Sequence, residues 1–284
     1  MRKAVNELFY ISGRIKENKL FFFPDQLLLI AFSFSTFLFL TSCEKVIHLD
    51  LNTSTPKIVI QGNIYDEPGP YQVKISSSVN FDDASEYPPV SGAIVLISDN
   101  SGQAEVLSES MPGTYKSSKI RAYADRSYSL SVKTGGKVFK AESNMPQGVE
   151  IDSIYFTKSP FSGDKITTIR FNDPPNTKNY YRIIYFVNDI QQKEFYVLSD
   201  DIFQGTKIVY SLMPRGSEIK LAEGDKVTVW LEAVDNGVYE YFRTAVTEGG
   251  QSASPSNPVS NISNGALGYF NACSVRKITA TVVK

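Results

Sequence analysis

Short runs of alternating apolar and polar residues, separated by turn-forming residues, dominate the sequence from residue 57 onward. In one such run, Tyr71, Val73 and Ile75 occupy every second position, which places three apolar side chains on one face of a strand. About seven runs of this kind precede residue 145, and none has helical spacing. The pattern predicts an immunoglobulin-like or transthyretin-like β-sandwich over residues 57–145.

The sequence Met145-Pro146-Gln147-Gly148 indicates a domain joint, after which residues 149–284 predict a second β-sandwich with one short helix. The helix is expected at about 237–248, because Val238, Tyr241, Phe242 and Ala245 recur at intervals of three and four residues. Its end is predicted by Gly249-Gly250. The strands of this half are expected at residues 165–171, 179–187, 194–198, 207–212, 226–234, 267–270 and 277–283. The predicted fold class is therefore all-β, with two tandem β-sandwich domains.

The N-terminal segment has the pattern of a lipoprotein signal peptide. Basic residues precede an apolar run of about 14 residues (27–40), which is shorter than the roughly 20 residues of a membrane-spanning helix. Leu40-Thr41-Ser42-Cys43 follows directly and is typical of a lipidation site. We expect residues 1–42 to be removed, Cys43 to carry palmitate-type acyl chains, and residues 43–56 to form a tether. The alternative is an uncleaved N-terminal membrane helix, with Cys43 as an ordinary residue.

The charge of the mature chain gives no indication of nucleic-acid binding. Subtracting the 5 basic and 3 acidic residues before Cys43 from the 29 and 30 of the whole chain leaves a net charge of about −3. A nucleic-acid interface requires clustered excess lysine and arginine. With Cys43 lipidated, Cys273 has no partner for a disulfide, and we expect it to be a buried, small apolar residue.

No catalytic site is predicted. His48 is the single histidine and lies in the tether, and no Gly-x-Ser-x-Gly motif occurs, which argues against a Ser-His-Asp triad and a histidine-ligated zinc site. Glycosidase chemistry with two carboxylates stays open, although no pair stands out. Asp82, Asp83 and Glu86 share a loop that does not match a calcium-binding loop, so a solvated acidic loop is expected. We predict a non-enzymatic protein without a cofactor or a metal.

Two segments are candidates for binding. The first is a set of aromatic residues in strand-like runs, for which we expect a core position rather than a ligand platform: Tyr180, Tyr181, Tyr185, Phe186, Phe195 and Tyr196. The second is a polar loop with the glycine-rich segment after it, where small residues permit close backbone approach. Its candidate interaction residues are Asn257, Asn261, Asn264, Gly265, Gly268 and Tyr269. The alternative for this loop is packing on the edge of the sandwich.

Several segments resemble a known family: KIVIQGNIYDEPGPYQVKIS, FNDPPNTKNYYRIIYF, KVTVWLEAVDNGVYEYF and NPVSNISNGALGYFNACS. The mature chain resembles a family of Bacteroidetes outer-membrane lipoproteins catalogued as a domain of unknown function. The resemblance implies an outer-membrane location, a gene beside a TonB-dependent receptor, and a role as accessory partner of that transporter. A stand-alone surface module that binds glycan or protein is the alternative. Cys43 is followed by a single acidic residue, Glu44, and then by Lys45, which leaves the membrane face open.

Overall fold

The computed structural model describes residues 55–79, 87–202, 204–214, 220–248 and 257–283. The chain divides into two compact units, Met1–Asp50 and Leu51–Lys284, and all described residues belong to the second. The predicted signal peptide, the lipidation site Cys43, His48 and the acidic loop with Asp82, Asp83 and Glu86 lie outside the described residues.

The described chain is mostly β-strand, as predicted, and contains one α-helix. The strands of the first half are β1 (Ile58–Tyr65), β2 (Gln72–Ser77), β3 (Ile94–Asp99), β4 (Ala104–Val106), β5 (Ser108–Met111), β6 (Thr114–Lys116), β7 (Arg126–Thr134) and β8 (Lys137–Met145). The second half contains β9 (Ile151–Lys158), β10 (Lys165–Asn172), β11 (Tyr180–Val187), β12 (Ile190–Ser199), η2 (Asp200–Ile202), β13 (Lys207–Leu212), β14 (Lys226–Val234), α2 (Asn236–Glu248) and β15 (Leu267–Thr281).

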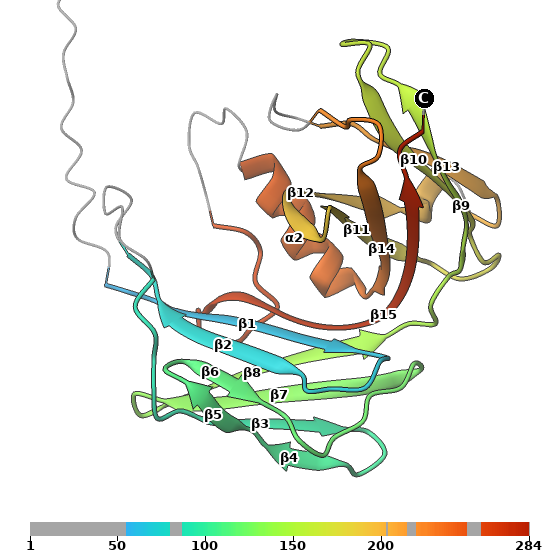
Figure 1. The fold of residues 1–284 in the computed structure, drawn as a ribbon. Coiled ribbons are helices and arrows are strands. Elements are labelled where there is room, and N and C mark those ends of the chain that lie inside the picture. The colour runs from blue at the N-terminus through green and yellow to red at the C-terminus, as the bar shows by residue number, and fades with distance from the viewer. Residues whose placement is uncertain (1–54, 80–86, 203, 215–219, 249–256, 284) are drawn as a thin grey trace, which may run out of the picture. The chain divides into compact units, whose positions relative to one another are not determined.

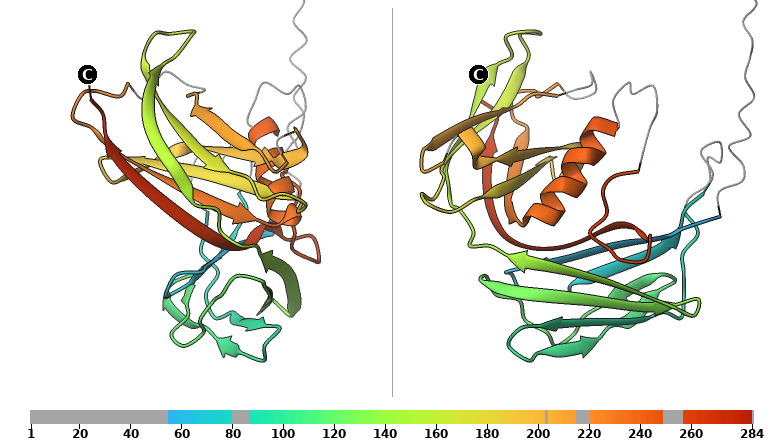
Figure 2. Two further views of the ribbon diagram at one scale, coloured as in Figure 1. Left: turned by 90° about the vertical axis from the view of Figure 1, so that its right-hand side faces the viewer. Right: turned by 180° about the vertical axis from the view of Figure 1, so that it is seen from behind.

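The strands form three sheets. The largest has eight strands in the order β12-β11-β14-β15-β1-β2-β6-β5, and the others have the orders β4-β3-β7-β8 and β13-β10-β9. Figures 1 and 2 show β15 curving from a position beside β1 to a position beside β14. The eight-stranded sheet therefore contains strands from both halves of the sequence.

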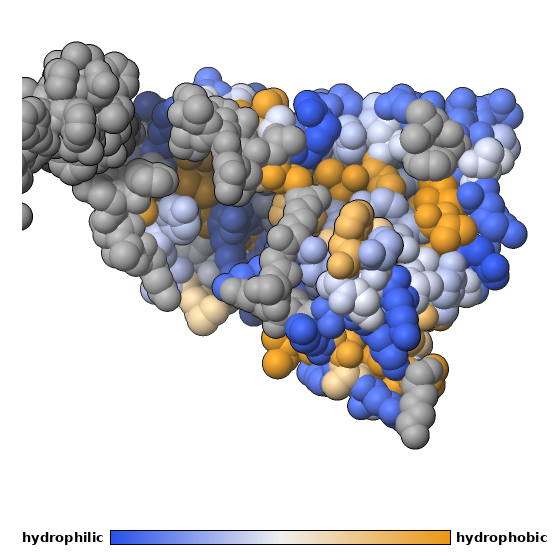
Figure 3. All heavy atoms as spheres, turned by 90° about the horizontal axis from the view of Figure 1, so that it is seen from above, coloured by the Kyte–Doolittle hydropathy of each residue, from blue (hydrophilic) through white to orange (hydrophobic). Residues whose placement is uncertain are grey.

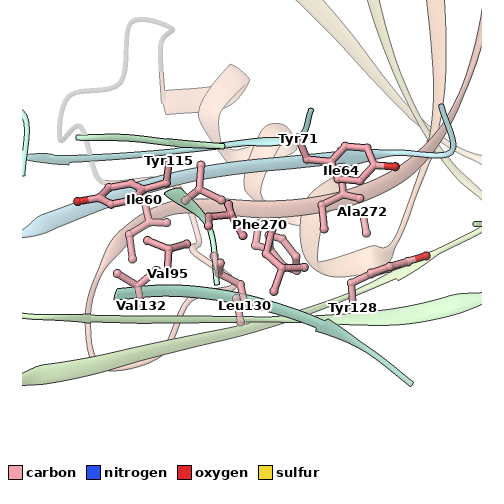
Figure 4. Packing of buried hydrophobic residues seen from close by; sticks show 14 of the residues in the cluster. Ile60, Ile64, Tyr71, Val95, Tyr115, Tyr128, Leu130, Val132, Phe270 and Ala272 are labelled. Carbon is pink, nitrogen blue, oxygen red and sulfur yellow. The ribbon is translucent and has the colours of Figure 1, made fainter. Parts of the chain in front are cut away.

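The first core lies between β1, β2, β6 and β15 on one side and β3, β7 and β8 on the other (Figure 4). Alternate residues of β1, among them Ile60 and Ile64, are fully buried there, and Phe270 and Ala272 of β15 join them. Burying each such large apolar side chain contributes about 1.5–3 kcal/mol. Because side chains alternate between the two faces of β1, the residues between these buried positions point away from this core.

The second core lies between the other end of the large sheet and the three-stranded sheet. Tyr181, Tyr185 and Tyr196 are buried in it. Helix α2 covers the face of the large sheet opposite this core and buries Val238 and Phe242. The helix begins one residue before the predicted segment, because Oδ1 of Asp235 accepts a hydrogen bond of 2.8 Å from the Val238 N–H and caps the first turn.

Strand β15 differs from the sequence-based prediction, which placed two separate strands at 267–270 and 277–283. The structure contains one strand of 15 residues, Leu267–Thr281. It pairs with β1 in parallel near its start and with β14 in antiparallel fashion near its end. Residues 271–275, between the two expected strands, are buried on both faces, so they show no alternation of apolar and polar side chains. Separate tandem sandwiches are not confirmed, because both cores share β15.

Gly268 makes the parallel pairing of β1 and β15 possible. Its φ is +95°, and a Cβ atom at this position would lie 1.9 Å from the carbonyl oxygen of Ile60. Any other residue would force the two strands apart, so the close backbone approach is restricted to glycine.

Candidate functional site

The outward face of β1 and its neighbours is the strongest candidate for a binding surface. Because Ile60 and Ile64 point into the first core, Gln61 and Asn63 point to the other side of the sheet. Strand register sets Gln61 beside Lys74 of β2 and beside Tyr269 of β15. The surface therefore consists of polar side chains in rows across β2, β1 and β15.

A groove runs over this surface in two adjoining parts that share Gln61. One part has a volume of about 360 Å³ and the other about 490 Å³. Figure 3 looks down on this side of the molecule and shows a hollow with hydrophilic side chains at its bottom. The lining of the groove includes Gln61, Asn63, Tyr65, Gln72, Lys74, Tyr87, Tyr241, Asn257 and Tyr269.

Helix α2 contributes the aromatic wall of the groove. The ring of Tyr241 from α2 lies 4.9 Å from the ring of Tyr269 of β15, centroid to centroid, and Phe242 packs against both. Burial, followed by the charge of neighbouring Tyr269, raises the pKa of Tyr241 to about 12. The Tyr241 phenol is therefore a neutral hydrogen-bonding group at physiological pH.

A chain of amide contacts holds the floor of the groove. Nδ2 of Asn63 donates to the hydroxyl of Tyr269 over 3.3 Å, and Nδ2 of Asn271 reaches Oδ1 of Asn63 over 3.4 Å. Nδ2 of Asn271 also lies 3.4 Å from Sγ of Cys273. Because Asn271 and Cys273 are fully buried, these contacts fix Asn63 from below.

A buried ion pair lies on the same side of the sheet, under α2. Nη1 of Arg182 donates to Oε2 of Glu232 over 3.0 Å, and the guanidinium stands 3.9 Å above the ring of Phe242. Burial lowers the pKa of Arg182, but Glu232 together with Tyr269, Tyr65 and Cys273 outweighs that effect, and the net pKa is raised. Burial and Glu232 also raise the pKa of Tyr65, so its hydroxyl stays protonated. Arg182, paired with Glu232 within the sheet, contacts Phe242 and so links the sheet to the helix that carries the aromatic wall.

The described lining of the groove carries a single charged side chain. Lys74 is the single ionic side chain among the described residues that line it, and no carboxylate does so. Nowhere in the described ranges do three His, Cys, Asp or Glu side chains gather as metal ligands. The arrangement supplies hydrogen-bond donors and acceptors beside aromatic rings, which suits noncovalent binding.

The predicted interaction residues fall into two groups. Asn257, Gly268 and Tyr269 line the groove. Asn261 instead hydrogen-bonds both backbone groups of Phe270, at 2.8 and 2.9 Å, and so occupies the open edge of β15. Asn264 donates to the carbonyl of Val138 over 2.6 Å. It lines, with Gly265, a different hollow.

The structure also locates the other residues singled out in the sequence. Burial in the core is confirmed for Tyr181, Tyr185 and Tyr196, while Tyr180 and Phe195 pack in the cluster with α2. Cys273 is fully buried, as expected. Within the part of the chain that the structure describes, every helix is too short or too polar to cross a membrane.

Sequence reasoning did not identify the residues of the groove floor, Gln61, Asn63, Gln72 and Lys74. Their signal was present in the period-two pattern, which assigns them to the face opposite the buried residues of β1 and β2. That pattern does not reveal that β15 and α2 enclose this face.

Residues 44–279 match the family model described as a domain of unknown function, DUF4249. The chain belongs to this family. The matched region covers nearly all of the sequence after Cys43. A comparison with curated proteins found no match.

Proposed function

Starting from this family membership, we propose that the chain is a lipid-anchored, non-enzymatic binding protein of the outer membrane, with the groove over β1, β2 and β15 as its ligand site. The observation that carries the proposal is the preformed groove itself. No hydrogen bond among the described residues engages the side-chain amides of Gln61 or Gln72. These groups are thus available to a ligand.

The anchor is supported by the sequence Leu40-Thr41-Ser42-Cys43 directly after an apolar run. The two-layer packing of the first core supports an immunoglobulin-like or transthyretin-like sandwich for residues 57–145. The packing of the second core supports a second sandwich within residues 149–284, joined to the first through β15.

The partner proposed from the family resemblance is a TonB-dependent outer-membrane transporter, which this protein would assist. The test is a mild-detergent pull-down of the tagged, lipidated protein from native outer membranes, with copurifying proteins identified. A stoichiometric barrel of this class is the expected result. Recovery of the protein alone would overturn the accessory role and favour a stand-alone surface module.

The groove itself is tested by site-specific photo-crosslinking in cells. A photoreactive residue replaces Gln61 in one variant and Gln191, an exposed amide on β12, in the control. We expect crosslinked species that form at position 61 and not at position 191. Equal products from both positions, or none from position 61, would remove the groove from the proposed function.

A further inference from the structure

We propose that the groove binds a neutral carbohydrate chain, an inference that rests on the proposed function and specifies its ligand. The charge of the groove is the first argument. Lys74 is its single ionic lining residue among those described, so within this described lining an acidic ligand would meet one cation and a basic ligand would meet no carboxylate. Binding of a charged polymer by this surface would leave most of the ligand's charges desolvated and unpaired.

The strand pairing of the floor argues against an extended peptide. β1 is hydrogen-bonded to β15 on one side and to β2 on the other, and β2 continues to β6. The remaining edge of β15 near Phe270 is occupied by Asn261. A peptide that adds a strand needs an open sheet edge. Here no such edge faces the groove, so recognition depends on side chains.

Those side chains have the chemistry that sugar hydroxyls require. A hydroxyl group both donates and accepts, and so does the amide of glutamine or asparagine, which makes Gln61 and Gln72 suitable partners for neighbouring hydroxyls. Tyr65 and Tyr241 add neutral phenols. The paired rings of Tyr241 and Tyr269 offer an apolar surface against which the C–H face of a sugar ring can pack.

Preorganisation favours the same conclusion. Asn63 is held by Tyr269 and Asn271, and Arg182 of the sheet stacks on Phe242 of α2. Weakly interacting hydroxyls gain affinity when the protein groups that meet them are already fixed, because less conformational freedom is lost on binding.

The experiment is calorimetric titration of the full lipidated chain in a detergent without a sugar headgroup. The probes are neutral hexasaccharides (maltohexaose, cellohexaose and mannohexaose), a uronic-acid hexamer and an uncharged hexapeptide. We expect at least one neutral hexasaccharide to bind, with an affinity that does not change between low and high salt. Gln61→Ala and Tyr269→Phe should each weaken it about three- to tenfold. Gln191→Ala, on the exposed part of β12, should leave it unchanged.

The possible results distinguish the class of ligand from the use of the groove as a binding site. Absence of binding by every neutral hexasaccharide overturns the carbohydrate inference, as does a saccharide affinity that Gln61→Ala does not alter. Binding of the hexapeptide alone, sensitive to Gln61→Ala, overturns the carbohydrate ligand but retains the groove as a binding site. Binding of the uronic-acid hexamer that Lys74→Ala and high salt abolish shows an acidic ligand instead. Failure of crosslinking at position 61 in cells, together with failure of all probes, removes the groove as well.

Discussion

Nη1 of Arg182 donates a hydrogen bond to Oε2 of Glu232 across 3.0 Å beneath helix α2, where the glutamate side chain is wholly inaccessible to solvent. Nε of Arg182 and Oε1 of Glu232 have no hydrogen-bond partner among the described residues. Each charge therefore depends on the other for most of its compensation. The pair is sensitive to loss of a single partner, since an isolated buried charge is costly.

Glu232→Gln should destabilise the protein by about 3–5 kcal/mol, because it leaves the Arg182 charge buried without a counterion. Replacing both residues, Arg182→Met with Glu232→Leu, should cost far less, since neither charge then has to be desolvated. Denaturant unfolding of both variants and the parent chain measures the difference. Equal destabilisation by the single and double variants would contradict the mutual dependence of the pair.

Gly268→Ala should destabilise the protein strongly, because the new Cβ would overlap the Ile60 carbonyl and the backbone has a φ of +95°. The left-handed conformation alone costs about 1–3 kcal/mol, and separation of β1 from β15 adds to it. Gly265→Ala is the matched control, since Gly265 has a φ of +70° with open space around it. Thermal and chemical unfolding should show the larger loss at position 268. A loss no greater than that of the control would argue against the close approach.

Asp99 should make stability depend on acid pH. Burial raises the pKa of its carboxyl, but the Gln103 N–H, the Ser101 hydroxyl and Arg126 outweigh burial and lower the pKa from 3.8 to about 2. The Asp99 carboxyl therefore binds a proton less readily in the folded chain than in the unfolded chain. The resulting stabilisation is complete above pH 3.8 and disappears as the pH falls towards 2.

Asp99→Asn should consequently lower the free energy of unfolding by an amount on the order of 2 kcal/mol near neutral pH and by much less near pH 2. The measurement is a series of urea unfolding curves across this pH range for both chains. Ser101→Ala, which removes one donor, should have a smaller effect with the same pH dependence. A difference between Asp99→Asn and the parent that stays constant with pH would disprove the assignment.

The thiol of Cys273 should react with thiol reagents only when the protein opens. It is fully buried, and burial together with Glu232 raises its pKa. Both effects suppress the reactive thiolate. In a chain with Cys43→Ser, the labelling rate should therefore rise with denaturant in parallel with unfolding. Rapid labelling of Cys273 under native conditions would show that this part of β15 is accessible to the reagent in the folded protein.

Cys43→Ser should abolish incorporation of an alkynyl palmitate and move the protein from the membrane to the soluble fraction. Cys273→Ser is the matched control and should retain the label. Metabolic labelling and fractionation check both outcomes. A Cys43→Ser protein that stays in the membrane with residues 1–42 attached would favour the uncleaved N-terminal helix.

Local patterns predicted most of the elements. Lys207–Leu212 and Lys226–Val234 form strands with the expected bounds, and α2 was displaced by one residue at its start. These elements have strong periodicity or clear turn residues at their ends. β15 was divided in the prediction because Asn271 and Ser274 look like loop residues in the sequence, although both are fully buried in the sheet.

The groove could not be predicted in the same way, because its parts come from distant segments. Gln61 and Tyr269 are cross-strand neighbours, although most of the described sequence lies between them. The parallel pairing of β1 with β15 produces no local signal in the sequence, because no turn connects the two strands. The polar loop before β15 was recognised as unusual, but the roles of Asn257 and Asn261 differ, which only tertiary structure reveals.

Because both cores share β15, the completion of both cores during synthesis depends on the same strand. β15 follows all the other described strands in the sequence, so neither half can complete its sheet before residues 267–281 have been synthesised. Such distant pairing also slows folding. A nascent chain therefore cannot complete either core before β15 has left the ribosome. Premature termination near residue 266 would disable both cores at once.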